Sequence, residues 1–330
     1  MPYFSILMPA YNAGPVIGET LDCLLAQTFT DWECIVVDDD SKDDTESAVR
    51  RYADPRIKFF RTGSNLGYAG NLKRCFDLAE GTCLFLLGND DILSPVCLER
   101  THAAFEMAPD IAIVTRAYYI WDTDPNQPIR YTPQLDPTTD RIISPDDDDH
   151  VWFMLFSTIA QLSSLAIKRE LMRGSVNPFC FPAHAEPFLA SFRDHRGVFL
   201  KGYLLAVRKG LSQSRHVSSI YDVSPLWSWV DCFDRVFAGP RWERPRRLGR
   251  DFVAKNVQGL VQVRCRSSLR NFLREVWLHV VYRPVNLVSW RFWLFAIGSF
   301  VMPPKALRRF TDRFTPLVCR PPSGTVALVR

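Results

Sequence analysis

Residues 36–41 read Val-Val-Asp-Asp-Asp-Ser, an apolar run that leads directly into three acids. A second apolar run at residues 86–87, Leu-Leu, leads in the same way into Gly-Asn-Asp-Asp at residues 88–91. Because the carboxyl ends of parallel strands meet at one edge of a sheet, where open α/β sheets bind their ligands, we expect these acids to lie close together. The sequence therefore predicts a sheet edge lined with carboxylates.

Residues 1–115 repeat one rhythm, in which a short apolar run is followed by a segment of helical periodicity. This rhythm predicts an α/β fold, a mostly parallel sheet flanked by helices. Strands are expected at Phe4–Met8, Cys34–Val37, Ile57–Phe60, Cys83–Leu87 and Ile111–Val114. Helices are expected at Val16–Gln27, Asp44–Tyr52, Ala69–Ala79 and Pro95–Met107. Residues 163–167 and 198–207 are expected to complete the sheet, and residues 120–150 to form a long surface loop.

Two nucleotide-binding classes are excluded by the turn after the first strand. A dinucleotide-binding fold would show GxGxxG there and a P-loop would show GxxxxGK[ST], whereas this chain has Pro9-Ala10-Tyr11-Asn12. Nine cysteines are scattered without a CxxC pair, so neither a zinc site nor a disulfide framework is expected. Residues 1–12 have no basic segment before the apolar run, so we expect no signal peptide and a cytoplasmic protein.

Charge divides the chain into two parts. Residues 1–240 hold 22 Lys and Arg against 32 Asp and Glu, while residues 241–330 hold 18 against 4. We therefore expect a main domain over residues 1–240 and a basic amphipathic helical tail over residues 241–330. Such a tail suits an anionic membrane surface; nucleic acid is not expected as a partner, because the tail has no recognisable reader motif.

The tail is expected to lie on a membrane rather than to cross it. Its most apolar stretch, Val285–Met302, is interrupted by Arg291, and a spanning helix needs about 20 apolar residues. Trp277, Trp290 and Trp293, with arginines nearby, fit helices that lie in the headgroup layer. The alternative is a helical appendage that packs on the main domain.

Several segments resemble the family 2 inverting glycosyltransferases of the GT-A fold, in particular bacterial O-antigen and capsule sugar transferases. The matching motifs follow one another in the order Met8–Asn12, Val36–Ser41, Asn65–Gly67, Gly70-Asn71, Ala79–Gly81 and Asn89–Asp91. The resemblance covers residues 1–110, becomes weaker over residues 111–210 and does not extend into the tail. It implies a nucleotide-diphospho-sugar transferase fold for the main domain.

The resemblance also implies roles for residues at the matched positions. Asp39 would bind the base of the donor nucleotide, and Pro9 and Tyr11 would line the pocket. Further donor contacts are expected from Asn65, Gly67, Asn71 and Asn89. Asp90 and Asp91 would hold a divalent cation, Mn2+ or Mg2+.

Two positions depart from the family pattern. Gly88 stands where the metal motif usually opens with an acid, which indicates a changed ribose contact. Asp40 stands where the first motif usually has glycine, which makes the turn less permissive.

Inversion needs one carboxylate that takes the proton from the acceptor hydroxyl. The family commonly places this base in a Glu-Asp pair at a helix start, and Pro182–Phe188 occupies that place with a Glu-Pro pair. Glu186 is the candidate base and His184 the second candidate; ordinary helix N-terminal charge is the alternative for Glu186. His216 resembles a family element that closes over the diphosphate, and a solvated loop histidine is the alternative there.

These features predict a metal-dependent, inverting hexosyl- or deoxyhexosyltransferase of polysaccharide synthesis. The donor is expected to be a UDP-, dTDP- or GDP-sugar and the acceptor a lipid-linked saccharide, with the protein peripheral on the inner face of the plasma membrane. Two other classes remain as alternatives. One is a catalytically silent scaffold or saccharide-binding module. The other is a sugar-nucleotide pyrophosphorylase, which normally has a Gly-rich basic loop after its first strand, where this chain has Pro9–Asn12 and then Ala13-Gly14-Pro15.

Overall fold

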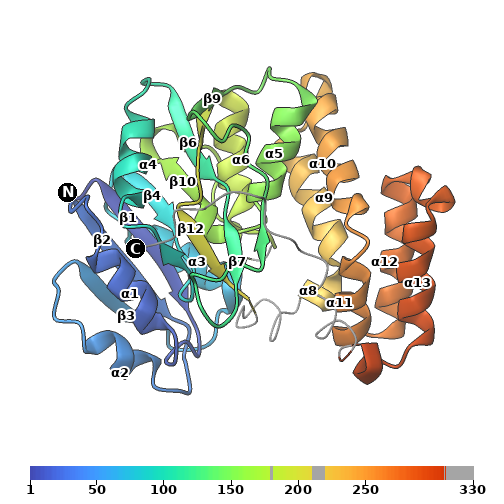
Figure 1. Cartoon of the computed structure of the whole chain (residues 1–330), viewed down its shortest axis with the longest axis horizontal. Helices are drawn as coiled ribbons and strands as arrows, with labels where there is room; N and C mark the ends of the chain where they lie inside the picture. Colours follow the sequence, from blue (N-terminus) through green and yellow to red (C-terminus); the bar gives the residue numbers. More distant parts are fainter. Residues whose placement is uncertain (179–180, 210–219, 308, 310–330) are drawn as a thin grey trace. The chain divides into compact units, whose positions relative to one another are not determined.

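A computed structural model describes residues 1–178, 181–209, 220–307 and 309 (Figure 1). These residues form two compact units, one that ends before residue 210 and one that begins after residue 219. The division lies ahead of residue 240, where we place the change of charge, because α9 (Pro225–Val236) packs against α10 (Glu243–Lys255). Charge and packing therefore divide the chain at different points.

An eight-stranded sheet forms the centre of the first unit, in the order β3-β2-β1-β4-β10-β6-β11-β9. Its strands are β1 (Phe4–Ala10), β2 (Trp32–Asp38), β3 (Ile57–Arg61), β4 (Cys83–Leu86), β6 (Ile111–Arg116), β9 (Arg141–Ile143), β10 (Leu165–Lys168) and β11 (Arg196–Leu200). The first four strands of this order pair in parallel, as do β6 and β11. Within this sheet, as the structure describes it, only β10 and β9 run antiparallel to their neighbours. The predicted mostly parallel sheet is confirmed.

Helices cover both faces of this sheet, which explains why its central strands are largely apolar. On one face, Phe4, Ile6 and Met8 of β1 pack in a cluster with α1, α2 and α4; on the other, Leu7 packs in a cluster with α3. The helices of the first unit are α1 (Ile17–Leu25), α2 (Thr45–Arg50), α3 (Gly67–Leu78), α4 (Cys97–Phe105), α5 (Asp149–Thr158) and α6 (Ala185–Asp194).

A second, four-stranded sheet corrects two expectations. It contains β5 (Ile92–Leu93), β12 (Leu205–Arg208), β7 (Tyr119–Trp121) and β8 (Arg130–Tyr131) in that order. The expected loop over residues 120–150 holds β8 and most of β7 from this sheet, and β9 from the large sheet. These strands are too short to show a sequence period. The expected single strand over residues 198–207 is two strands, β11 and β12, separated by a turn in which Gly202 has a φ of +76°.

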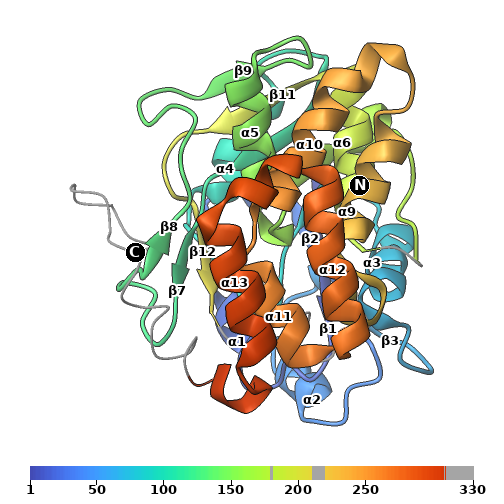
Figure 2. The same cartoon turned by 90° about the vertical axis from the view of Figure 1, so that its right-hand side faces the viewer.

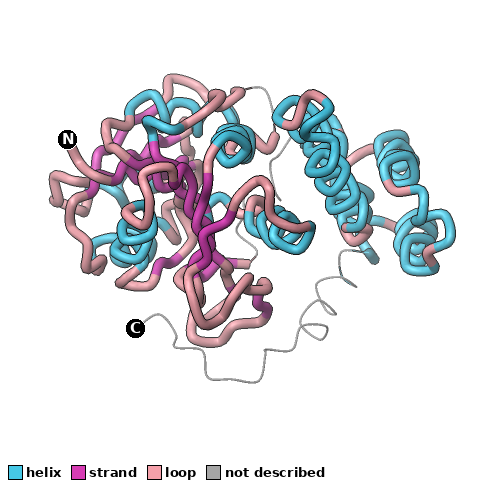
Figure 3. The backbone as a smooth tube through the Cα atoms, turned by 90° about the horizontal axis from the view of Figure 1, so that it is seen from above, coloured by secondary structure: helices cyan, strands magenta, loops and turns pink. Residues whose placement is uncertain are grey.

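The second unit consists of helices over its described residues, and Figure 3 shows the strands gathered in the first unit. The helices are α8 (Ile220–Val223), α9, α10, α11 (Gly259–Arg266), α12 (Leu269–Tyr282) and α13 (Trp290–Val301). A 3-10 turn, η4 (Pro284–Val288), joins α12 to α13. Figure 2 shows α11, α12 and α13 side by side, and both α12 and α13 pack against α11. Among the described helices, none combines the length and apolar content that crossing a bilayer requires.

Replacing Gly81 by alanine is expected to destabilise the first unit by about 1–3 kcal/mol, because the new methyl group would overpack a tight contact. A Cβ atom there would lie 2.4 Å from the backbone nitrogen of Ser5 on β1. Gly63→Ala is the matched control, since no atom lies within 4 Å of a Cβ at Gly63. Urea unfolding of both variants measures the difference; equal free energies of unfolding would contradict the packing at Gly81.

Candidate functional site

The carboxyl ends of β2, β1 and β4 form one edge of the large sheet. β1 lies between the other two, with Ala10 opposite Asp38 and Leu7 opposite Leu86. The backbone N–H of Asp39 donates to the Ala10 carbonyl (2.8 Å). Asn89 reaches the same edge from β4, where its Nδ2 donates to the carbonyl of Pro9 (2.9 Å). The structure thus brings together Pro9, Asp39 and Asn89 from three separate motifs.

Asp39 is a buried carboxylate at the mouth of this edge, with 2% of its surface exposed. Its Oδ1 accepts hydrogen bonds from the backbone N–H of Leu66 (2.7 Å) and from Thr62 Oγ1 (3.3 Å). Asn65 Nδ2 donates to the Asp39 carbonyl (3.2 Å), and the N–H of Gly67 donates to Asn65 Oδ1 (3.0 Å). Burial raises the pKa of the Asp39 carboxyl, and the amide hydrogen bonds oppose that rise. These contacts fix the orientation of the carboxylate.

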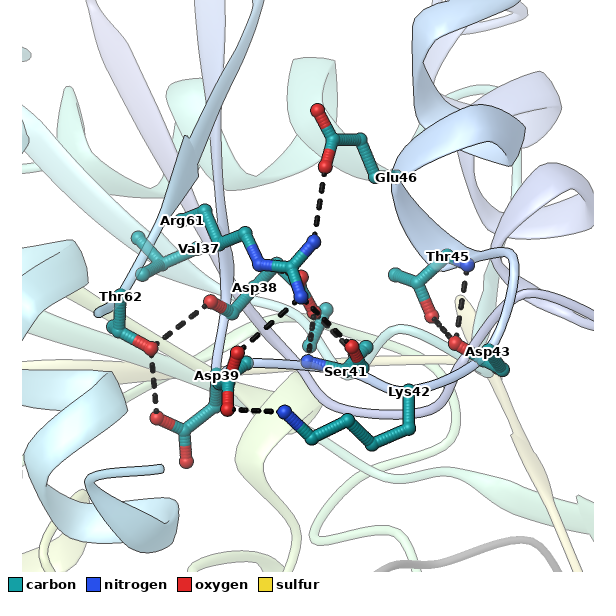
Figure 4. A network of polar contacts seen from close by, with 12 residues as sticks. Val37, Asp38, Asp39, Ser41, Lys42, Asp43, Thr45, Glu46, Arg61 and Thr62 are labelled. Carbon is teal, nitrogen blue, oxygen red and sulfur yellow. Dashed lines mark hydrogen bonds and ion pairs between the residues drawn. The ribbon is translucent and has the colours of Figure 1, made fainter. Parts of the chain in front are cut away.

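The turn after β2 contains the unusual Asp40, whose φ is +60°. Aspartate is among the few non-glycine residues that adopt this left-handed conformation readily, so it can replace glycine here. Arg61, at the end of β3, secures the turn: its Nη2 donates to the Ser41 carbonyl (2.9 Å) and to Asp40 Oδ1 (3.3 Å), and its Nη1 donates to Glu46 (3.1 Å) (Figure 4). We did not predict a role for Arg61.

Asn71 ties two strands together at the same edge. Its side chain is 3% exposed, and Nδ2 donates to the carbonyls of Ala10 on β1 (3.2 Å) and Val37 on β2 (3.0 Å). This amide therefore satisfies two strand-end carbonyls that lie beside the predicted donor site. Its predicted contact with the donor stays a prediction. Tyr11, which directly follows β1, is half-buried.

The acidic loop after β4 holds its two aspartates in different environments. Asp91 is 1% exposed. Its carboxylate accepts hydrogen bonds from Gln161 Nε2 (2.7 Å), Ser163 Oγ (2.5 Å) and the backbone N–H of Arg208 (3.1 Å). Burial, and to a smaller extent Asp90, raise the pKa of the Asp91 carboxyl. Asp91 thus holds the loop in place, while Asp90 is half-buried and more accessible to a ligand.

The loop fits a divalent cation that arrives with a diphosphate. A Cβ atom at Gly88 would lie 3.0 Å from Asp91 Oδ2 and 3.3 Å from Asp90 Oδ1, so an acid at this position would have to fit against both aspartates. With glycine there, Asp90 is the more accessible carboxylate of the loop. One carboxylate is enough to bind a divalent cation when phosphate oxygens and water complete its coordination shell. Within the described residues, no group of three or more His, Cys, Asp and Glu side chains could hold a metal ion.

Arg208, at the end of β12, is a second residue that we did not predict. Besides its backbone contact with Asp91, its Nε donates to the Asp90 carbonyl (3.4 Å) and its Nη2 donates to Glu19 (2.5 Å). The guanidinium lies 3.9 Å from the centre of the Trp121 ring. Arg208 therefore places a half-buried positive charge directly beside the acidic loop. The sequence offers no signal for it, because the contact depends on β12 pairing with β5.

The two candidate bases lie next to each other at the start of α6 but differ in their surroundings. His184 is buried, and its Nε2 donates to the Ile159 carbonyl (2.8 Å). Nδ1 must then accept from the Tyr68 hydroxyl (2.6 Å), so both ring nitrogens are engaged within the protein. Burial lowers the pKa of this imidazole to about 4. Glu186 is half-buried in the first turn of the helix and is the better placed of the two. His216 lies outside the described residues.

Residues 5–162 match the family model described as Glycosyl transferase family 2. The chain is 39% identical over 88 residues to the UDP-Glc:alpha-D-GlcNAc-diphosphoundecaprenol beta-1,3-glucosyltransferase WfgD of Escherichia coli. These 88 residues are 27% of this chain and 35% of that protein. It is 35% identical over 96 residues to the GalNAc(5)-diNAcBac-PP-undecaprenol beta-1,3-glucosyltransferase of Campylobacter jejuni, 28% of this chain and 31% of that protein. The matches thus span about a third of the length of these relatives.

Solved structures resemble almost the whole chain. S. aureus TarS 1-349 in complex with UDP has a TM-score of 0.62 at 15% identity, over 94% of this chain and 91% of that chain. The mannosyltransferase PcManGT from Pyrobaculum calidifontis, in complex with GDP-Man and Mn2+, has a TM-score of 0.53 at 17% identity, over 91% and 86%. At these identities the likeness shows the fold, and the predicted GT-A fold is confirmed.

The contribution of His184 to the stability of the first unit is expected to fall as the pH drops from 6.5 to 4, while the raised pKa of the buried Asp91 carboxyl acts in the opposite direction in wild type and variant alike. Over this range the unfolded chain binds a proton on His184, whereas the folded chain, whose imidazole pKa is about 4, does not; the loss is about 3 kcal/mol. Urea unfolding across this range should show a smaller loss for His184→Gln, which has no titrating ring. The same pH dependence in both proteins would contradict a buried neutral His184.

Proposed function

We propose that the protein transfers a sugar from a nucleotide-diphosphate donor to a hydroxyl of a lipid-linked saccharide in cell-surface polysaccharide synthesis, because residues 5–162 match the model of glycosyl transferase family 2. One observation carries the proposal: the ends of β2 and β4 place Asp39 and Asp90 at the same sheet edge as the end of β1. Such a donor needs one carboxylate that binds the nucleobase and one that binds the divalent cation of the diphosphate.

The donor base is proposed to bind at Asp39. Leu66 and Thr62 hold Oδ1 and orient this carboxylate, which would accept an N–H of the nucleobase. Pro9 and Tyr11 would line the pocket, and Asn65 and Gly67 would lie near the ribose and phosphates. The solved structures named above support a nucleotide donor, since TarS was solved with UDP and the mannosyltransferase with GDP-Man. The donor classes proposed are UDP-, dTDP- and GDP-sugars.

Asp90 is proposed to hold the divalent cation, Mn2+ or Mg2+. When bound, this cation would offset the negative charge that grows on the departing diphosphate. Asp91 would contribute by keeping the loop in place, because Gln161, Ser163 and Arg208 already engage its carboxylate. The presence of Mn2+ in the solved mannosyltransferase supports metal dependence.

Glu186 is proposed as the base of an inverting reaction. Its carboxylate would take the proton of the acceptor hydroxyl while that oxygen forms a bond to the anomeric carbon. The bond from this carbon to the diphosphate oxygen breaks at the same time, and the diphosphate leaves with the electron pair. His184 is not proposed for this step, because Tyr68 and Ile159 engage both of its ring nitrogens.

The acceptor is proposed to be a saccharide on a lipid diphosphate at the inner face of the plasma membrane. The E. coli and C. jejuni relatives support this class, since their names specify diphosphoundecaprenol and PP-undecaprenol substrates. The basic tail over residues 241–330 would keep the protein peripheral on an anionic membrane. No nucleic acid is proposed as a partner.

A catalytically silent scaffold or saccharide-binding module in the same pathway is the second candidate. The specific observation in its favour is Gly88, which removes one acid from the metal motif. Such a protein would bind the nucleotide donor without turning it over.

Release of nucleoside diphosphate from a panel of UDP-, dTDP- and GDP-sugars, with Mn2+ and a bacterial lipid extract, tests the proposal. Release from one donor that depends on the extract supports the transferase. Tight donor binding by calorimetry without any release would favour the silent scaffold. If neither binding nor release is observed, the donor site is wrong.

Glu186→Gln is expected to lower the turnover number by about 100- to 10,000-fold, because the general base is lost, while donor affinity stays unchanged. The steady-state rate and calorimetric donor binding are the two measurements. Glu170→Gln is the matched control, since Glu170 is an exposed glutamate of the same unit that pairs with Lys168. A Glu186→Gln protein with the wild-type turnover number would remove Glu186 from the mechanism.

Asp90→Asn is expected to weaken Mn2+-dependent binding of the nucleoside diphosphate by about 100-fold, comparable to the larger losses seen when groups that support a metal site are removed. Calorimetry with Mn2+ and with EDTA separates the contribution of the metal, and both proteins should bind equally weakly in EDTA. Asp77→Asn, at an exposed position on α3, is the control. An equal gain from Mn2+ in wild type and Asp90→Asn would place the metal elsewhere.

A further inference from the structure

Helix α13 is apolar on the side that it exposes as well as on the side that it buries. Phe292 and Ala296 pack into a cluster with α11 and α12. Trp290, Leu294 and Ile297 are 70%, 58% and 55% exposed. A helix that is hydrophobic all round is normally covered on all sides, so the outer side of α13 needs a partner.

Helix α12 exposes a similar stripe. Leu269, Leu273, Trp277 and Val281 recur every four residues, which places them on one face, and all four are exposed. The 3-10 turn η4 between the two helices exposes Val288 as well. We call the exposed apolar side chains of α12, η4 and α13 the apolar helical face; Leu273, Trp277, Trp290, Leu294, Ile297 and Phe300 represent it.

The exposed charges carried by α12, η4 and α13 are all positive, and Asp251 of α10 pairs with Arg283 directly after α12 (3.0 Å). Between residues 252 and 307 the only acid is Glu275. Glu275 is 2% exposed and is turned inward, where it accepts hydrogen bonds from the Ser224 hydroxyl and the backbone N–H of Leu226 (2.9 Å). Arg270 and Arg291, in contrast, are exposed on α12 and α13. A surface that joins apolar side chains to uncompensated arginines is complementary to an anionic, partly apolar partner.

The basic residues of α10 differ from those of α12 and α13. Arg250 pairs with Asp234 (2.7 Å), and Arg246 pairs with Glu243. These ion pairs compensate the charge of α10 locally, so the basic character of the tail is not uniform. The acid-free surface of the second unit lies on the helices that also expose tryptophan.

We propose that the apolar helical face docks onto an anionic lipid bilayer, with the axes of α12 and α13 in the plane of the headgroups. Tryptophan favours this layer because its ring is apolar and its N–H is polar, and arginine adds attraction to anionic lipid. The inference rests on the proposed function, which puts the acceptor in a membrane, and it narrows the membrane contact to a defined surface. Neither α12 nor α13 crosses the bilayer in this arrangement.

Flotation of the full chain with vesicles tests the proposal. The wild-type protein should float with phosphatidylcholine vesicles that contain phosphatidylglycerol, and less with phosphatidylcholine alone. Arg270→Gln with Arg291→Gln should weaken binding to the anionic vesicles by about thirtyfold at low salt. Trp290→Gln with Leu294→Gln should weaken binding to both vesicle types, because it removes apolar contact.

Met107→Gln with Ile142→Gln is the matched control, since it exchanges two exposed apolar side chains of the first unit. Control and wild type should bind vesicles equally, and circular dichroism should show that all variants fold. Unchanged vesicle binding in the Trp290 and Leu294 variant overturns the proposal. A wild-type protein that self-associates in solution and does not bind vesicles also overturns the proposal, because a second copy would then cover the apolar helical face.

Nucleoside diphosphate binding in solution separates this inference from the proposed function. Variants that no longer bind vesicles but still bind the nucleotide support the docking surface and show that the donor site is unaffected. A wild-type protein that binds anionic vesicles but turns over no sugar donor would refute the transferase and retain the docking surface.

Discussion

Parallel pairing of β1 with β2 on one side and with β4 on the other decides where the polar residues of this protein lie. Each strand is buried along its length and mostly apolar; Ser5 of β1 and Glu33 of β2 are polar exceptions that hydrogen-bond to each other, and further polar residues appear where the strands end. The pairing register brings three such ends to one edge. Asn71 stabilises this arrangement, because its amide donates to carbonyls at the ends of both β1 and β2. The proposed donor site is thus a consequence of sheet pairing.

Neighbouring acids at this edge have different tasks. Asp38 is buried, accepts a hydrogen bond from the Ser41 hydroxyl and lies 3.7 Å from Arg61, while Asp39 follows it at the mouth of the site. Asp91 is likewise committed to the protein, while Asp90 beside it is half-buried. In each pair one carboxylate holds the loop, and the other is the one that we propose for the ligand. Buried carboxylates of this kind are costly unless they are hydrogen-bonded, and both structural acids are.

Much of the fold could be predicted from the sequence. The four strands β1–β4 were expected within two residues of their ends, because buried parallel strands give continuous apolar runs. The short strands β7, β8 and β9 were missed, since two or three residues show no period. Arg61 and Arg208 were missed because they reach the site from β3 and β12, and no local pattern marks such an approach. The candidate status of His184 came from its position in the chain, which carries no information about what occupies its ring nitrogens.

The central claim is that the edge formed by β2, β1 and β4 binds a nucleoside diphosphate together with a divalent cation. A crystal structure of the protein with Mn2+ and the nucleoside diphosphate that binds best tests this most directly, since anomalous scattering locates the manganese. We expect the manganese beside the Asp90 carboxylate and the nucleobase beside Asp39. Manganese and nucleotide bound together at any other place on the first unit would contradict it.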